Sequence, residues 1–348
     1  MATRAILVAV ALLFPAIIFA QTRTVPFRFG VFPGVSTQGA EGDWNSVSNV
    51  SINFFGGVTG GVNGVELATL FNIDKGNVQF VQAAGLFNVV GGNMRGVQSA
   101  GLFNYVHEQS SGVQAAGLYN HSKKDVKGVQ AGGIANFSGG KVSGVQAAGI
   151  ANFSGGTVGG VQAAGILNVA KRVKGLQVGL INLADTSEGL QLGLINITRR
   201  GYHKVYVSAN EIMNANIAVK TGNPKLYSIL VAGMNPKADE KIYSYGFGLG
   251  REIKLGNAFT LNPEISSQYL YLGNWHYDNW LSKVQLLVNV RLAKNIAITG
   301  GPSFAMYYSD QTSPVKGYKF DIPSYHSYEL WNKNWKGWIG WSAGLTFF

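Results

Sequence analysis

The chain has 348 residues, of which 46% are hydrophobic and only 13% are charged, with 47 glycines and a formal net charge of +11. An average protein has about 25% charged residues, so the low charge excludes charge-driven disorder. So much glycine argues against a helical fold, because each glycine in a helix interior costs about 1 kcal/mol. The absence of cysteine excludes disulfides, thiolate metal sites and cysteine nucleophiles. The composition therefore predicts an all-β protein.

Residues 1–20 have the pattern of a secretory signal peptide. Arg4 precedes the apolar run AILVAVALLFPAIIFA, and polar residues follow it at once. A transmembrane helix needs about 20 apolar residues, so this run is short for an anchor. We expect cleavage after Ala20, with an uncleaved N-terminal anchor as the alternative. No later stretch holds about 18 consecutive apolar residues, so a mature chain that is integral to a membrane would have to form a closed β-barrel.

Residues 61–200 form an internal repeat in which asparagine and glutamine recur every sixteen residues and, in the last copies, about every fourteen. The unit reads GVQAAGLYN at 112–120 and GVQAAGIAN at 144–152. Side-chain amides form hydrogen-bonded ladders in stacked β structures, so we expect a structural role for these two columns rather than ligand binding. The expected ladder residues are Gln82, Asn88, Gln98, Asn104, Gln114, Asn120, Gln130, Asn136, Gln146, Asn152, Gln162, Asn168, Gln177, Asn182, Gln191 and Asn196.

Two architectures fit this repeat. The staves of an antiparallel barrel alternate in direction, so they would give a period of two copies, whereas every coil of a β-solenoid has the same environment. Apolar residues in the apparent turns, such as Val126 and Val142, favour a solenoid in which they point inward beside Val113 and its equivalents. The alternation within VQAAGLFN at 81–88 leaves the second architecture open, in which the repeats are additional barrel strands.

The segments on either side of the repeat alternate as outer-membrane barrel strands do. In KVQLLVNVRL at 283–292, one face is apolar and the other carries most of the polar side chains. This pattern is typical of a strand that crosses a bilayer with its apolar face outward. We expect residues 21–60 to supply the first barrel strands and residues 201–348 the remaining ones. Six tryptophans after residue 270 predict an aromatic girdle or, alternatively, loops that stack on sugars.

The units GLQVGLIN at 175–182 and GLQLGLIN at 189–196 resemble the surface-repeat family of Gram-negative outer-membrane proteins. The terminal Phe348 is similar to the signal that barrel-assembly machinery recognises. The resemblance covers residues 61–200 and implies an outer-membrane location, contact with lipid or lipopolysaccharide and handling by that machinery. It implies no biochemical activity, because none is established for the family. One departure is that the apolar face of the last strand, which includes Leu345 and Phe347, is out of phase with Phe348.

No constellation for catalysis or cofactor binding is found in the sequence. The five histidines lack the spacing of a metal site, and the chain has neither a P-loop nor a G-x-S-x-G elbow. We therefore expect no enzyme activity, no metal, no cofactor and no nucleic-acid partner. Basic clusters such as 171–172 and 199–200 lie in repeat turns, where contact with anionic lipid is an alternative to simple solvation.

The sequence thus predicts an all-β protein, an outer-membrane-type antiparallel β-barrel with an inserted repeat segment that forms a β-solenoid. The expected role is structural or in interactions at the cell surface, like that of an adhesin or scaffold, with an unidentified cell-surface partner. The side of the membrane that the repeats face is left open. The alternative function is a passive or gated pore, which would prefer anions if basic side chains line its lumen.

Overall fold

The computed structural model describes residues 23–323 and 327–348, so the expected signal peptide lies outside the described residues. Their regular secondary structure is almost entirely β-strand, as expected. None of the helices among them is long and apolar enough to cross a membrane. The chain divides into two compact units, Met1–Glu108 and Gln109–Phe348, which are considered separately below.

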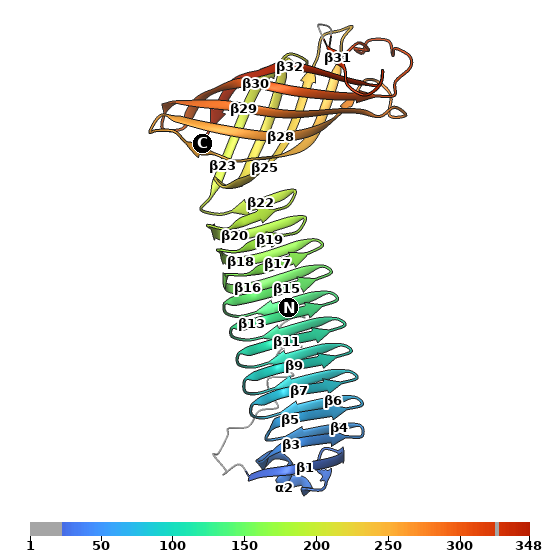
Figure 1. Cartoon of the computed structure of the whole chain (residues 1–348), viewed down its shortest axis with the longest axis vertical. Helices are drawn as coiled ribbons and strands as arrows, with labels where there is room; N and C mark the ends of the chain where they lie inside the picture. Colours follow the sequence, from blue (N-terminus) through green and yellow to red (C-terminus); the bar gives the residue numbers. More distant parts are fainter. Residues whose placement is uncertain (1–22, 324–326) are drawn as a thin grey trace, which may run out of the picture. The chain divides into compact units, whose positions relative to one another are not determined.

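The first unit consists of parallel β-coils that begin with β1 and β3. Two strands alternate in each later coil, a longer one and a four-residue one, and each pairs with its equivalent sixteen residues on (Figure 1). Its elements are β1 (Arg23–Phe32), β2 (Val35–Ser36), α2 (Gly39–Asn45), β3 (Ser46–Asn53), β4 (Gly56–Thr59), β5 (Gly61–Ala68), β6 (Phe71–Asp74), β7 (Val78–Ala84), β8 (Phe87–Val90), β9 (Met94–Ala100) and β10 (Phe103–Val106).

The expectation that residues 21–60 supply barrel strands is wrong. β1 pairs in parallel with β3, and β3 pairs in parallel with β5 of the repeat. Their inward polar side chains, which include Arg28 and Asn53, continue the polar interior of the coils. Alternation of polar and apolar residues is common to both architectures, so it did not distinguish an end coil from a barrel strand.

The second unit begins with the same kind of coil, from β11 to β22. β13 pairs in parallel with both β11 and β15, with Gly128 opposite Gly112 and Gly144. The repeat is therefore a solenoid, and the alternative of barrel staves is wrong. The coil elements are β11 (Ser110–Ala116), β12 (Tyr119–Ser122), β13 (Val126–Gly132), β14 (Ala135–Ser138), β15 (Val142–Ala148), β16 (Ala151–Val158), β17 (Val161–Ala164), β18 (Leu167–Val173), β19 (Leu176–Val178), β20 (Ile181–Ser187), β21 (Leu190–Leu192) and β22 (Ile195–Thr198).

The interior of these coils is part apolar and part amide. Val126 and Val142 are buried, as expected, in a cluster with their equivalents on the following coils. Val113, expected beside them, instead faces outward, because strand alternation turns it away from the buried Gln114. Glycine is required at position 128, where φ is +125° and a Cβ atom would lie 2.1 Å from the carbonyl oxygen of Gly112.

The remainder of the second unit is a closed antiparallel barrel of eight strands, joined in order and closed by pairing of β23 with β32 (Figure 1). All eight strands follow the repeat. The strands of this part are β23 (Tyr202–Asn210), β24 (Ala215–Asn223), β25 (Leu226–Asn235), β26 (Ile242–Gly250), β27 (Ile253–Lys254), β28 (Phe259–Tyr271), β29 (Asn279–Ala293), β30 (Ile296–Ser309), β31 (Tyr328–Glu329) and β32 (Trp335–Phe347). Of these, β27 and β31 are short additions that pair with β28 and β32.

The barrel has the expected apolar exterior and partly polar interior. In β29, Val284 and Leu286 are about half exposed, whereas Lys283 and Asn289 are buried. The apolar face of β32 also points outward, and Phe348 lies beyond the end of that strand. Phe348 is out of phase with the apolar face because it lies beyond the last residue of β32 that pairs with another strand. Its ring lies 4.4 Å from Lys204 Nζ.

Candidate functional site

All sixteen ladder residues are buried, and within each unit hydrogen bonds join the side chains of neighbouring coils. In each unit, an asparagine Nδ2 donates to the Oδ1 of the next asparagine, as Asn136 does to Asn152 at 3.0 Å. Glutamines donate in the opposite direction, as Gln146 Nε2 does to Gln130 Oε1 at 2.8 Å. A primary amide both donates and accepts, so each column satisfies its own buried groups. The columns therefore stabilise the coils.

The glutamine column of the first unit ends on a pair of buried acids. Gln82 Nε2 donates to Glu66 Oε2 at 2.9 Å and also to Asp74. Burial is the largest cause that raises the pKa of Glu66, and burial followed by the nearby Glu66 charge raises the pKa of Asp74 well above its usual value. Two carboxyls this close do not both ionise readily, so loss of the second proton from the pair is shifted to higher pH. The last amide of the column, that of Gln82, directs its N–H groups beyond the end of the column. This end therefore requires hydrogen-bond acceptors.

The asparagine column of the first unit begins at a buried arginine side chain. Asn53 Nδ2 donates to Asn72 Oδ1 at 2.9 Å, and its own Oδ1 accepts from the guanidinium of Arg28. Arg28 is buried and also forms an ion pair with Asp43, with Nε 2.9 Å from Oδ1. The group at the end of each column thus complements the last amide. Carboxyl groups accept from the last N–H of the glutamine column, and a guanidinium donates to the first amide oxygen of the asparagine column.

In the second unit the columns end at the junction with the barrel. Thr198 Oγ1 donates to Gln191 Oε1 at 2.8 Å, which completes the glutamine column. Asn196 Nδ2 donates to Ser228 Oγ of β25 at 2.6 Å, so the asparagine column ends on a barrel strand. Asn223 Nδ2 adds a bond to the carbonyl oxygen of Gly189 at 2.7 Å. The last coils are therefore joined to the β24–β25 turn by buried hydrogen bonds.

The barrel lumen is filled by side chains. Tyr227 OH donates to Glu264 Oε1 at 2.7 Å and accepts from Asn262 Nδ2 at 2.9 Å. Apolar clusters, one of them around the fully buried Trp338, occupy the same interior. An eight-stranded barrel has room for side chains and little else. The lumen also contains buried ion pairs between Lys204 and Glu252, Lys220 and Glu264, and Lys283 and Glu211.

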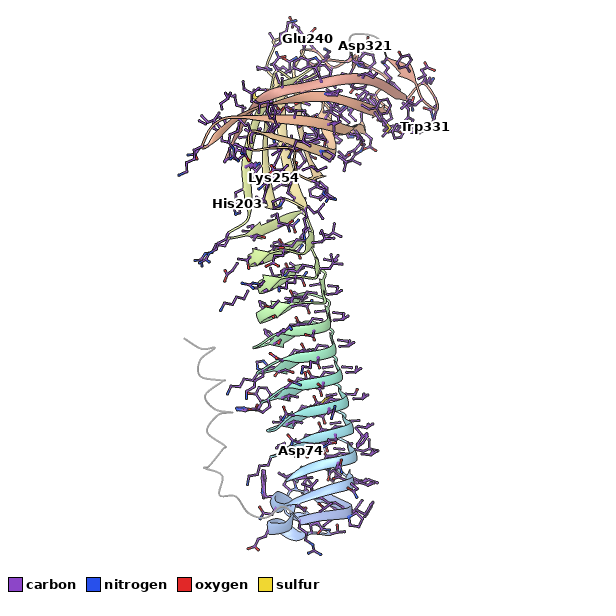
Figure 2. All side chains as sticks on the ribbon, turned by 60° about the vertical axis from the view of Figure 1, so that its left-hand side comes forward. Asp74, His203, Glu240, Lys254, Asp321 and Trp331 are labelled. Atoms are coloured by element: carbon purple, nitrogen blue, oxygen red, sulfur yellow. The ribbon has the colours of Figure 1, made fainter. Side chains whose placement is uncertain are left out.

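The two ends of the barrel differ. At the end that adjoins the coils, strands are joined by residues 224–225, 251–258 and 294–295. The other end carries 211–214, 236–241, 272–278 and the described parts of 310–334. Figure 2 shows His203 and Lys254 at the first end and Glu240, Asp321 and Trp331 at the second.

Aromatic side chains gather at the end with the longer loops. Trp275 stacks on Tyr269 with ring centroids 5.6 Å apart, and Trp331 meets Trp335 edge-on at 5.1 Å. An aromatic belt was expected from the tryptophans, although Trp338 instead lies in the lumen, where its Nε1 donates to Glu211. This cluster leaves open the alternatives of a girdle and a sugar-stacking loop.

The exterior of the second-unit coils has a basic edge and an apolar edge. Exposed lysines and arginines lie along the basic edge, and one pocket of about 460 Å³ among them is lined by Lys171 and Arg172 of β18 and by Arg199 and Arg200 after β22. The opposite turns carry a row of exposed aliphatic side chains. This row consists of Leu118, Ile134, Ile150, Ile166, Leu180 and Leu194.

Within residues 23–323 and 327–348, no three His, Asp or Glu side chains are grouped as metal ligands. The histidines are dispersed, with His121 in a coil and His276 in a barrel loop, while His326 lies outside the described residues. The buried acids and the lumen ion pairs were not predicted from the sequence. One signal for the acids was present, because Glu66 occupies the position that glutamine holds in every later coil.

No family model, no curated protein and no solved structure matches this chain.

Proposed function

We propose that the protein is an outer-membrane β-barrel whose role is to anchor the β-solenoid, which acts in structure or interaction rather than in catalysis. The observation that supports this most directly is the barrel itself, with exposed Val284, Leu286 and Ile298 outside and polar side chains inside. An apolar exterior and a polar interior are typical of a barrel that is surrounded by lipid. The coils supply a rigid repetitive surface, which is what a scaffold or adhesin needs.

The loop lengths favour one orientation of this barrel. Outer-membrane barrels have short turns on the periplasmic side and longer loops outside. The short-turn end is the one that Asn196 and Asn223 bond to the last coils. The coils of the second unit would then leave the barrel on the periplasmic side, rather than at the cell surface where the sequence suggested an interaction role.

A chain without cysteine allows this orientation to be tested by single-cysteine labelling of intact cells with a membrane-impermeant maleimide. Ser313 is exposed in a long loop and Ser143 is exposed on a coil. We expect Ser313→Cys to react in intact cells and Ser143→Cys to react only after the outer membrane is permeabilised. Labelling of Ser143→Cys in intact cells would place the coils outside.

Barrel insertion is tested by extraction and gel mobility. The mature protein should remain in the membrane fraction in alkaline carbonate and should migrate faster in a gel before boiling than after it. Release by carbonate would instead favour a non-membrane extracellular protein. These measurements do not depend on the side that the coils face.

A pore is the second candidate function, because polar side chains line much of the lumen. The buried Lys220–Glu264 pair and the stacked Tyr202 and Tyr227 rings, 4.5 Å apart, argue against an open path. We therefore expect no single-channel steps from folded protein in a planar bilayer. Reproducible steps with anion preference would favour the pore instead.

A further inference from the structure

The pocket of about 460 Å³ on the basic edge lies on four successive coils of the second unit, and its charged side chains come from the last three of them. Arg172 pairs with Thr186 of the next coil, and Ala184 pairs with Thr198 of the coil after that. The lining residues thus form two columns along the coil axis. Neighbouring coils are about 4.8 Å apart, so the cations on either side of the Asp185 coil lie about 10 Å from each other. One column runs from Lys171 through Asp185 to Arg199, and the other from Thr157 through Arg172 and Thr186 to Arg200.

The charge of this pocket is uncompensated. Its lining carries four basic side chains and the single carboxylate of Asp185, a balance of +3 by subtraction. None of its lysines or arginines takes part in the ion pairs found in the described chain. All five charged side chains are exposed. Like charges held this close raise the local potential and attract an anion.

The short-turn end of the barrel extends this positive surface. Arg199 and Arg200 lie directly before β23, and the turns of this end carry further exposed cations. The acid of this end, Glu252, is paired with Lys204. The cations are Lys225, Arg251, Lys254, Arg291 and Lys294. The long-loop end differs, because acids such as Glu240 and Asp321 lie there beside lysines, in ion pairs with Lys237 and Lys336.

We propose that the pocket lined by Lys171, Arg172, Arg199 and Arg200 binds the phosphate of an anionic lipid headgroup at the bilayer surface. The inference rests on the proposed function, since an inserted barrel brings its short-turn end to the level of the headgroups. Arginine suits this ligand because its planar guanidinium binds phosphate oxygens in a bidentate manner. A lipid is favoured over free phosphate because the positive surface continues around the end of the barrel. A bilayer surface can place several anionic headgroups against that surface at the same time, whereas a free phosphate contacts only the pocket.

The test is native mass spectrometry of the detergent-purified full-length protein titrated with phosphatidylglycerol, phosphatidylcholine or inorganic phosphate. The pocket variant is Arg172→Gln/Arg200→Gln. The matched control is Lys127→Gln/Lys141→Gln, which removes two exposed cations from earlier coils on the same edge. Each basic side chain near an anionic surface contributes about fivefold to binding, so the pocket variant should bind phosphatidylglycerol roughly 25-fold more weakly. The control should be unchanged.

Three results would overturn the inference: equal loss in the pocket variant and the control, equal binding of phosphatidylcholine and phosphatidylglycerol, or inorganic phosphate binding as tightly as phosphatidylglycerol. The last would identify a free-phosphate site. Failure of the proposed function is distinguishable, because it would appear as release from membranes by carbonate whatever the lipid affinity. Faster gel migration before boiling, measured on every variant, shows that the barrel has folded.

Discussion

Asn196 Nδ2 donates to Ser228 Oγ at 2.6 Å, and Ser228 Oγ in turn donates to the carbonyl oxygen of Gly193 at 2.6 Å. One hydroxyl of the barrel thus completes both the asparagine column and a coil turn. Loss of this hydroxyl removes one hydrogen bond from each of these groups, while Asn196 Nδ2 still donates to the carbonyl oxygens of Gln191 at 3.0 Å and Gly193 at 3.2 Å, so the change costs about 0.5–1.5 kcal/mol.

Ser228→Ala should therefore loosen the last coil while the barrel stays intact. Hydrogen exchange of amides in 190–198 should quicken by between about twofold and tenfold, as that free energy implies. Ser143→Ala, at an exposed coil serine, is the control and should change nothing. Unaltered exchange in Ser228→Ala would mean that water replaces the hydroxyl at no cost.

Removal of one whole coil should be tolerated. Deletion of residues 128–143 brings Gly144 into the place of Gly128, with which it is in register, and stacked repeats contribute roughly additive neighbour terms. The variant should fold and show the same dependence of gel mobility on boiling as the full chain.

The control for the coil deletion is removal of residues 128–135, which ends within a coil and sets the following strand out of register. This variant should lose protection of the coil amides against hydrogen exchange. Equal damage from the two deletions would contradict independent stacking of coils.

The first unit should become less stable as pH rises. Burial raises the pKa of Asp74 well above its usual value, so the folded chain holds a proton that the unfolded chain releases from about pH 4 upward. Stability is therefore fully present below pH 4 and is lost progressively until the pH passes the raised pKa. Asp74→Asn removes the ionisable group and should flatten this dependence, with higher stability at pH 8.

The measurement is hydrogen exchange of amides in 61–84 at several pH values, corrected for the intrinsic effect of pH on exchange. Glu41→Gln, at an exposed acid of the same unit, should leave the dependence as it is. If Asp74→Asn loses protection at pH 8 instead, the carboxylate form of Asp74 is the stabilising one and the assigned direction is wrong.

Glu264→Gln should destabilise the barrel, because it leaves the buried Lys220 charge without its partner. Removal of one member of a buried pair typically costs about 3–5 kcal/mol. The temperature at which the fast-migrating gel form is lost should fall. Lys220→Met/Glu264→Gln, which removes both charges, should recover most of that temperature.

Glu240→Gln is the matched single change, at an acid in a barrel loop whose exposed pair with Lys237 contributes little. It should leave the temperature of mobility loss unchanged. A Glu264→Gln barrel as stable as the unchanged protein would mean that the lumen is hydrated enough to solvate Lys220.

The repeat register followed from the sequence because each copy carries Gln and Asn at fixed places, and the buried columns confirm it. The apolar face of β29 was equally readable from its alternation. The assignment of residues 21–60 was wrong, because Arg28 and Asn53 look like lumen residues until their parallel partners are known. The lumen pairs could not be predicted, since Lys220 and Glu264 lie on non-adjacent strands, β24 and β28, and meet only when the barrel closes.

The opposed donor directions of the two columns have an electrostatic consequence. In an α-helix the aligned peptide dipoles add along the axis and leave partial charges at the ends. Here each coil carries one asparagine amide that donates forward and one glutamine amide that donates backward. Their axial dipoles largely cancel within every coil. Solenoids of this design can therefore grow or shrink by whole coils without building up a field at either end, and the same terminal residues serve any length.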